Sequence, residues 1–86
     1  MAFLIRPSTK DTKELILQIT PRHGPVFARS ELYSVVGVDF DTIELLSGDF
    51  LLVTGGKDTI KNNLASFLSN SRVNGPSILC EPKEID

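Results

Sequence analysis

The segment 42–53, TIELLSGDFLLV, constrains the fold more than any other part of the sequence. Two short runs of β-prone residues, 42–46 and 50–53, flank the turn-forming triplet 47–49, Ser-Gly-Asp. Short apolar runs on either side of such a triplet are typical of a β-hairpin. We therefore predict two adjacent antiparallel strands here.

A second hairpin is predicted near the N-terminus. Residues 3–5 and 14–20 are β-prone, and the polar stretch between them is rich in turn formers. Leu15, Leu17 and Ile19 alternate along the second of these strands, so they share one face of it.

The first predicted helix follows a loop rich in proline and glycine. Leu32, Val35 and Val36 lie at the i, i+3, i+4 spacing of a buried helical face. Ser30 is the expected N-cap, because its hydroxyl accepts hydrogen bonds from the first helical N–H groups. Gly37 is expected to end the helix.

The second predicted helix begins near Asp58 or Thr59, either of which is a suitable cap. Its apolar stripe, at i, i+4, i+7 and i+8, consists of Ile60, Leu64, Phe67 and Leu68. We therefore expect Leu64 and Phe67 to be core residues.

The resulting order is β-β-α-β-β-α-β, with residues 77–80 as the fifth strand and 83–86 as a flexible tail. This order predicts a single two-layer α+β domain, 1–86, with a mostly antiparallel five-stranded sheet and both short helices on one face. Strands 14–20 and 50–53 are apolar on both sides. A second copy of the chain is the simplest cover for the remaining face, so we expect a homo-oligomer, a dimer or higher.

Charge and composition restrict the function. The chain has 86 residues, a net charge of −2 and one cysteine. No basic stripe for nucleic acid and no disulfide framework is present, and the N-terminal apolar run is too short for a signal peptide or a membrane span. We expect a cytoplasmic protein that binds neither nucleic acid nor membrane.

Two stretches together resemble a known family. They are ELYSVVGVDFDTIELLSGDFLLVTGGKDTIKNNLASFL and GPSILCEP. The chain resembles a family of small uncharacterised α+β domains found in bacteriophages and mobile elements. The positions that carry the resemblance are Leu32, Val36, Gly37, Ile43, Gly48, Leu52, Val53 and Asn63. The resemblance implies this fold and a phage-like origin, and it implies no activity.

Residues 53–60, VTGGKDTI, follow the order of strand, glycines, lysine and helix found in phosphate-binding loops. A P-loop requires Gly-x-x-x-x-Gly-Lys-Ser/Thr, but here Leu51 takes the first glycine position and Asp58 the hydroxyl position. We interpret the stretch as a turn and a helix cap. Lys57 remains a candidate ligand for an anion at the helix start.

Arg22, His23 and Arg29 surround one loop and are the other candidate binding residues. Arginine offers a bidentate fork to an anion or to an acidic surface of a partner. The carboxylates Asp39, Asp41, Glu44 and Asp49 match no calcium loop, and we interpret them as solvated residues of a strand edge. Cys80 is expected to be a packed core residue.

No nucleophile–base pair and no set of metal ligands occurs in the sequence, so we predict neither an enzyme nor a cofactor. The first hypothesis is a small non-enzymatic binding protein of phage or mobile-element type, which modulates or inhibits a host protein through protein–protein contacts. The alternative is an oligomer that binds or sequesters a nucleotide or another anion near Arg22, His23 and Arg29.

Overall fold

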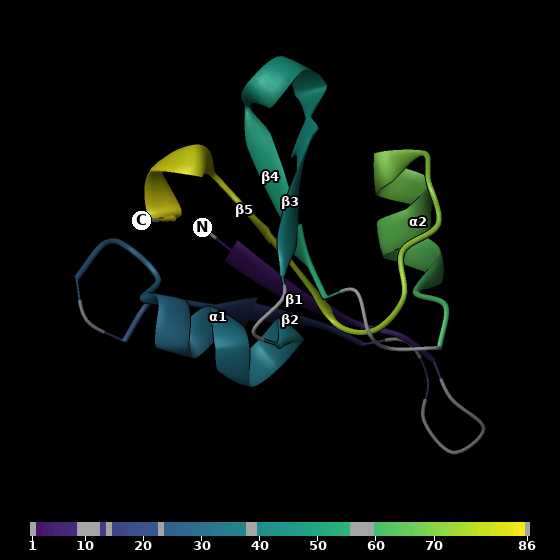
Figure 1. The fold of residues 1–86 in the computed structure, drawn as a ribbon, viewed down its shortest axis with the longest axis horizontal. Helices are drawn as coiled ribbons and strands as arrows, with labels where there is room; N and C mark the ends of the chain where they lie inside the picture. Colours follow the sequence, from purple (N-terminus) through teal and green to yellow (C-terminus); the bar gives the residue numbers. More distant parts are fainter. Residues whose placement is uncertain are drawn as a thin grey trace.

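A computed structural model describes residues 2–8, 13, 15–22, 24–37, 40–55 and 60–85. The strands are β1 (Ala2–Arg6), β2 (Leu15–Ile19), β3 (Asp41–Leu45), β4 (Phe50–Thr54) and β5 (Ser77–Cys80). The α-helices are α1 (Arg29–Val36) and α2 (Asn63–Ser69), and the 3-10 helices are η1 (Leu46–Gly48) and η2 (Pro82–Glu84). The described residues thus confirm the predicted order of strands and α-helices (Figure 1).

The described strands form one sheet in the order β2-β1-β5-β4-β3, and every neighbouring pair is antiparallel. The two predicted hairpins are confirmed as β1–β2 and β3–β4. The last strand, β5, lies between them and hydrogen-bonds to one strand of each. The small five-stranded α+β fold is therefore confirmed, and β2 and β3 are its edge strands.

One face of the sheet packs against α1. Leu4 and Val53 are both register partners of Ile78, and all three are buried together with Leu32 of α1. This cluster forms the larger core, and Phe27 completes it from the loop before the helix.

The other face packs against α2. Leu52 and Leu79 are register partners, and they form a second core with Ala65 of α2 and Val73. Leu52 precedes Val53 of the first core, and adjacent strand residues point to opposite faces. The prediction that both helices lie on one face is therefore wrong, because β4 carries large side chains on both sides and each side needs a cover. Figure 1 shows the two helices on either side of β5.

Helix α1 ends where predicted, but it begins two residues earlier and has a different cap. Ala28 is the N-cap residue and contributes no side-chain hydrogen bond, so Ser30 is not the cap. Glu31 in the first turn instead bonds back to the chain before the helix: its Oε1 accepts from the Ala28 N–H at 3.2 Å, and its Oε2 accepts from the Arg22 N–H at 3.0 Å. Gly37, at φ 98°, ends the helix as predicted.

Helix α2 begins later than predicted and turns a different side to the sheet. Asn62 is its N-cap, instead of Asp58 or Thr59. Phe67 is 81% exposed, whereas Ala65 is fully buried, so the prediction of Phe67 as a core residue is wrong. The predicted stripe omitted Ala65, which is the residue of α2 that is buried in the second core with Leu52.

Asn62 fixes the start of α2 against the sheet. Its side chain is fully buried, and Nδ2 donates to the carbonyls of Ile5 at 3.0 Å and Gly75 at 2.9 Å. Its Oδ1 accepts from the Ala65 N–H at 3.1 Å. This one side chain therefore caps the helix and joins it to β1, and the sequence pattern did not single it out.

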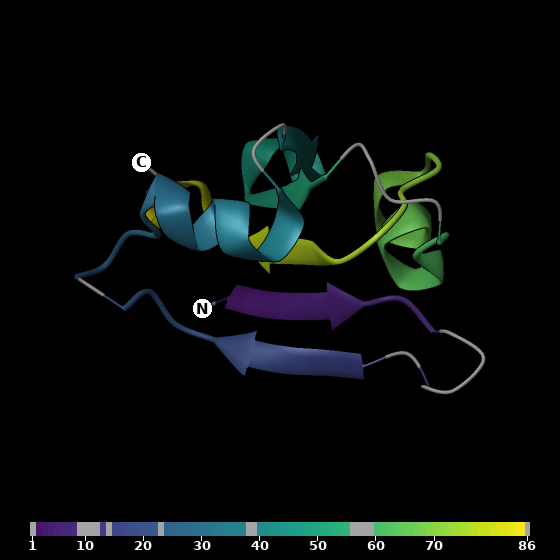
Figure 2. The same ribbon diagram turned by 60° about the horizontal axis from the view of Figure 1, so that its bottom comes forward.

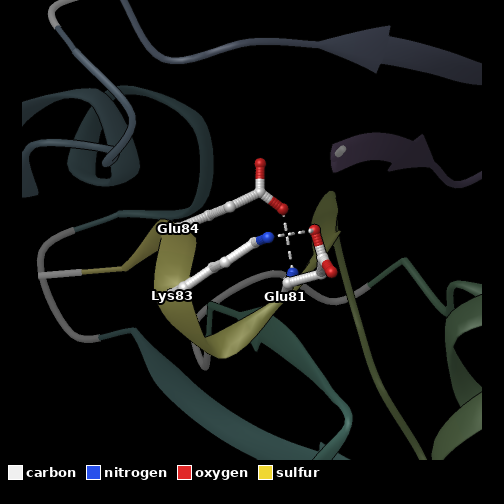
Figure 3. Close-up of polar contacts among 3 residues, drawn as sticks. All are labelled: Glu81, Lys83 and Glu84. Atoms are coloured by element: carbon white, nitrogen blue, oxygen red, sulfur yellow. Dashed lines mark hydrogen bonds and ion pairs between the residues drawn. The ribbon is translucent and has the colours of Figure 1, made fainter.

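The C-terminal segment is packed, in contrast to the flexible tail expected for 83–86. Glu84 is buried, and its carbonyl accepts from the Phe27 N–H at 2.7 Å. Its Oε1 accepts from the Glu81 N–H at 3.0 Å, and Lys83 Nζ lies 3.9 Å from Glu81 Oε2 (Figure 3). The bond between Phe27 and Glu84 holds η2 beside the loop that leads into α1; the last residue lies outside the described part of the chain.

Candidate functional site

Of the predicted cations, Arg22 and Arg29 lie in the described part of the chain, and the cavity that Arg22 lines does not include Arg29. Arg22 and Arg29 are both exposed, and His23 lies outside the described residues. Arg22 lines a cavity of about 160 Å³ between β2 and α1, which we call the α1 cavity, and Glu31 lines it too while Arg29 does not. A carboxylate beside Arg22 opposes the binding of an anion.

The glycine pair of the TGGK stretch has a packing explanation at its first member. A Cβ atom at Gly55 would overlap the backbone carbonyl of Val36, so any side chain here would push β4 away from the end of α1. Gly55 thus allows a close approach of two backbones. Lys57, with the rest of 56–59, lies outside the described residues.

Two of the acidic residues, Asp41 and Glu44, lie as expected at an exposed edge, on β3. Asp49 is exposed in the turn before β4, and Asp39 lies outside the described residues. Within the described part of the chain, no group of three His, Cys, Asp or Glu side chains lies close enough to share a metal ion.

Cys80 is fully buried, which confirms its predicted place in the core. Burial, with the nearby carboxylates of Glu84 and Glu81, raises the pKa of its thiol from 9.0 to about 12. The thiol is therefore protonated at neutral pH, and a protonated, buried thiol is a poor nucleophile.

A feature that sequence reasoning missed lies between the β3–β4 hairpin and α2. An apolar cavity of about 220 Å³ opens here, and we call it the apolar hollow. Its walls consist of Leu45, Leu46, Phe50, Leu68 and Leu79. The absence of polar side chains among these walls favours an apolar occupant over an ion or a sugar.

Leu46 stands at the mouth of this hollow in an unusual state. It is 71% exposed and has a φ of 52°, in the left-handed region. A leucine rarely adopts this conformation, because its Cβ crowds the backbone. The sequence signal for it is a large apolar residue directly before the turn 47–49, which the β-prone pattern assigns to the strand.

A second hollow lies along α2. Phe67, Lys61 and Arg72 line a cavity of about 350 Å³ whose other walls are amide and hydroxyl side chains. Phe67 and Leu68 are consecutive, so α2 separates this polar, cationic hollow from the apolar one. The two hollows share no lining residue, so the α2 side of the molecule carries two separate hollows, one apolar and one polar.

Comparison of the chain with protein-family models, curated proteins and solved structures finds no match. In the described part of the chain, neither α-helix has the length and apolar character needed to cross a membrane.

Proposed function

We propose that the chain is a small non-enzymatic binding protein in the cytoplasm, and that a partner protein inserts an apolar side chain into the apolar hollow beside α2. The resemblance to phage and mobile-element domains supports the further proposal that this partner is a host protein, which the chain modulates or inhibits by binding.

Leu46 carries the proposal. A left-handed conformation costs a residue with a Cβ about 1–3 kcal/mol, and glycine or asparagine avoids much of that cost. A simple turn would gain nothing from a leucine that is both strained and exposed. The leucine is explained when a partner covers it, because burial of its side chain then stabilises the complex.

The polar hollow on the other side of α2 also supports a protein partner. Phe67 is exposed beside Lys61 and Arg72, and aromatic and arginine side chains are the residues most often found as energetic anchors of protein interfaces. The described residues give less support to an anion site, because Glu31 lies beside Arg22.

Selection of peptide ligands tests the proposal even though the partner is not identified. A display library of random peptides is panned against the wild-type protein, and the affinities of the selected peptides are measured for wild type and Leu46→Asn. We expect peptides with a large apolar residue whose affinity falls about tenfold or more in the variant.

The same variant separates function from stability. Asparagine tolerates the left-handed conformation, so Leu46→Asn should melt at the wild-type temperature or above it. Leu15→Asn, a change of the same kind on exposed β2, is the matched control and should keep full peptide affinity. Peptides that bind wild type and Leu46→Asn equally well would overturn the proposal.

A further inference from the structure

Strand β2 is an open edge of the sheet. It pairs with β1 on one side, and the described sheet continues no further on the other (Figure 2). Leu15, Ile16 and Leu17 are 43%, 54% and 39% exposed, and the strand contains no charged residue. An uncharged, apolar edge strand with free N–H and C=O groups is a template for pairing with another strand.

The strand is suited to pair with a second copy of itself. In an antiparallel arrangement centred on Leu17, each Leu17 faces the other, Leu15 faces Ile19, and Ile16 faces Gln18. This is the register that pairs the whole strand, and it places Leu15, Leu17 and Ile19 of both copies on one continuous apolar face. Such a contact is isologous, because both copies use the same surface.

The α1 cavity supplies an independent reason for this partner. The cavity lies on the α1 face at the Ile19 end of β2, and Phe27, Val35 and Ile78 are among its apolar walls. In the register above, Leu15 of the second copy stands beside Ile19 and points to the same face. An exposed leucine at one end of the strand therefore meets a cavity at the other end, and the two-fold symmetry makes this contact twice.

We propose that two copies of this chain form a closed dimer by antiparallel pairing of their β2 strands, in which Leu15 of each copy fills the α1 cavity of the other. The sheets of the two copies join into one. Because short strands bury little area, the interface belongs to the small class, and the dimer forms in the micromolar range.

Sedimentation or light scattering from about 1 μM to about 1 mM measures the association. We expect the wild-type mass to rise from one chain to two and to stop there. Leu17→Lys, at the centre of the pairing, should remain a single chain at every concentration. Thr42→Lys, on the other edge strand and also exposed, is the matched control and should behave as wild type.

Disulfide trapping tests the register separately. Facing residues of an antiparallel pair have Cα atoms about 4.5–5.5 Å apart, within the range that a disulfide bridges. Under oxidised glutathione, Leu17→Cys should cross-link into dimers rapidly, while Ile16→Cys, which faces Gln18, should cross-link far more slowly. Cys80 is fully buried and does not compete.

Three results would overturn the proposal. A wild-type mass of one chain up to the highest concentration would remove the dimer, and a mass that grows beyond two chains would remove its closed symmetry. Equal cross-linking rates for Leu17→Cys and Ile16→Cys would remove the register, even if Leu17→Lys failed to fold. None of these outcomes bears on peptide binding at Leu46.

Discussion

Strands β2 and β3 are both edges of the sheet, and each is five residues long. Strand β3 carries the exposed carboxylates of Asp41 and Glu44, and its alternate residues Ile43 and Leu45 pack against the second core. Strand β2 has no charge, and its apolar side chains are exposed. Charges on an edge oppose pairing with another chain. The comparison indicates that one edge is protected against association, whereas the other is left open to it.

The two edges also differ in what covers them. Strand β3 has contacts with α2, whereas on β2 only Ile19 packs against a core cluster. A strand held by one neighbour and few side-chain contacts gains much from a partner. The difference between the edges can be tested by substitutions on β2, on β3 and in the interior of the sheet, which should change the free energy of unfolding and the association of the chain to different extents.

The largest expected effect contrasts Leu52→Ala with Leu15→Ala. Leu52 is fully buried on β4, so its truncation should lower the free energy of unfolding by about 2–5 kcal/mol. The same truncation of Leu15 in dilute, monomeric protein should change it by no more than about 0.5 kcal/mol. Urea unfolding measures both. Similar losses for the two variants would show that β2 is packed like an interior strand.

Asn62→Ala should have the next largest effect. It removes the cap of α2 and leaves the carbonyls of Ile5 and Gly75 without their Asn62 donor, at a cost of about 2–3 kcal/mol. The bond from Asn62 to the Ile5 carbonyl anchors β1, and β1 is the strand with which β2 pairs. Asn63→Ala, an exposed neighbour, is the control for urea unfolding. Equal stability of the two variants would contradict the anchoring role.

Periodicity predicted the elements well where it was local. The hairpins, the C-terminal end of α1 and the strand 77–80 could be predicted because alternation and turn residues act between neighbours. The start of α2 could not, because Asn62 is drawn inward by carbonyls from distant parts of the chain, Ile5 and Gly75. The placing of the two helices on opposite faces was missed for the same reason, because each helix packs against strands that are distant from it in the sequence.

The candidate sites were harder to predict. Charged residues drew attention to Arg22 and Arg29, yet only Arg22 lines the α1 cavity. The apolar hollow forms where the β3–β4 hairpin packs near α2, and residue spacing in the sequence does not predict which elements lie side by side. Leu46 was the one clue in the sequence, since a large apolar residue at a turn is out of place in a solvent-exposed loop.

The pH dependence of stability tests whether Cys80, on the central strand β5, is as deeply buried between the two edges as the structure shows. The unfolded chain loses the Cys80 proton above pH 9, but the folded chain keeps it until about pH 12, so stability is fully present below pH 9 and is lost as the pH rises toward 12. The slope is about 1.4 kcal/mol per pH unit. In urea unfolding, the free energy of unfolding of Cys80→Ala should lack this fall between pH 9 and pH 12. If the free energy of unfolding fell in parallel for both proteins, the burial of Cys80 would be contradicted.

The smallest expected effect on stability tests the protected edge. Asp41→Thr combined with Glu44→Leu removes the carboxylates of β3, and because both residues are exposed, each change should alter the free energy of unfolding by no more than about 0.5 kcal/mol. Association should change much more. With two open edges per chain, the closed dimer becomes a link in a longer assembly, so light scattering should show masses beyond two chains. Adding Leu17→Lys should close the β2 edge again and limit these assemblies to pairs.

Asp49→Leu is the control. Asp49 is exposed beside β4 but outside any strand, so this change adds an apolar side chain without opening an edge and should leave the mass unchanged. If the double variant keeps the wild-type mass at all concentrations, the carboxylates of β3 do not protect it, and the contrast between the two edges has another cause.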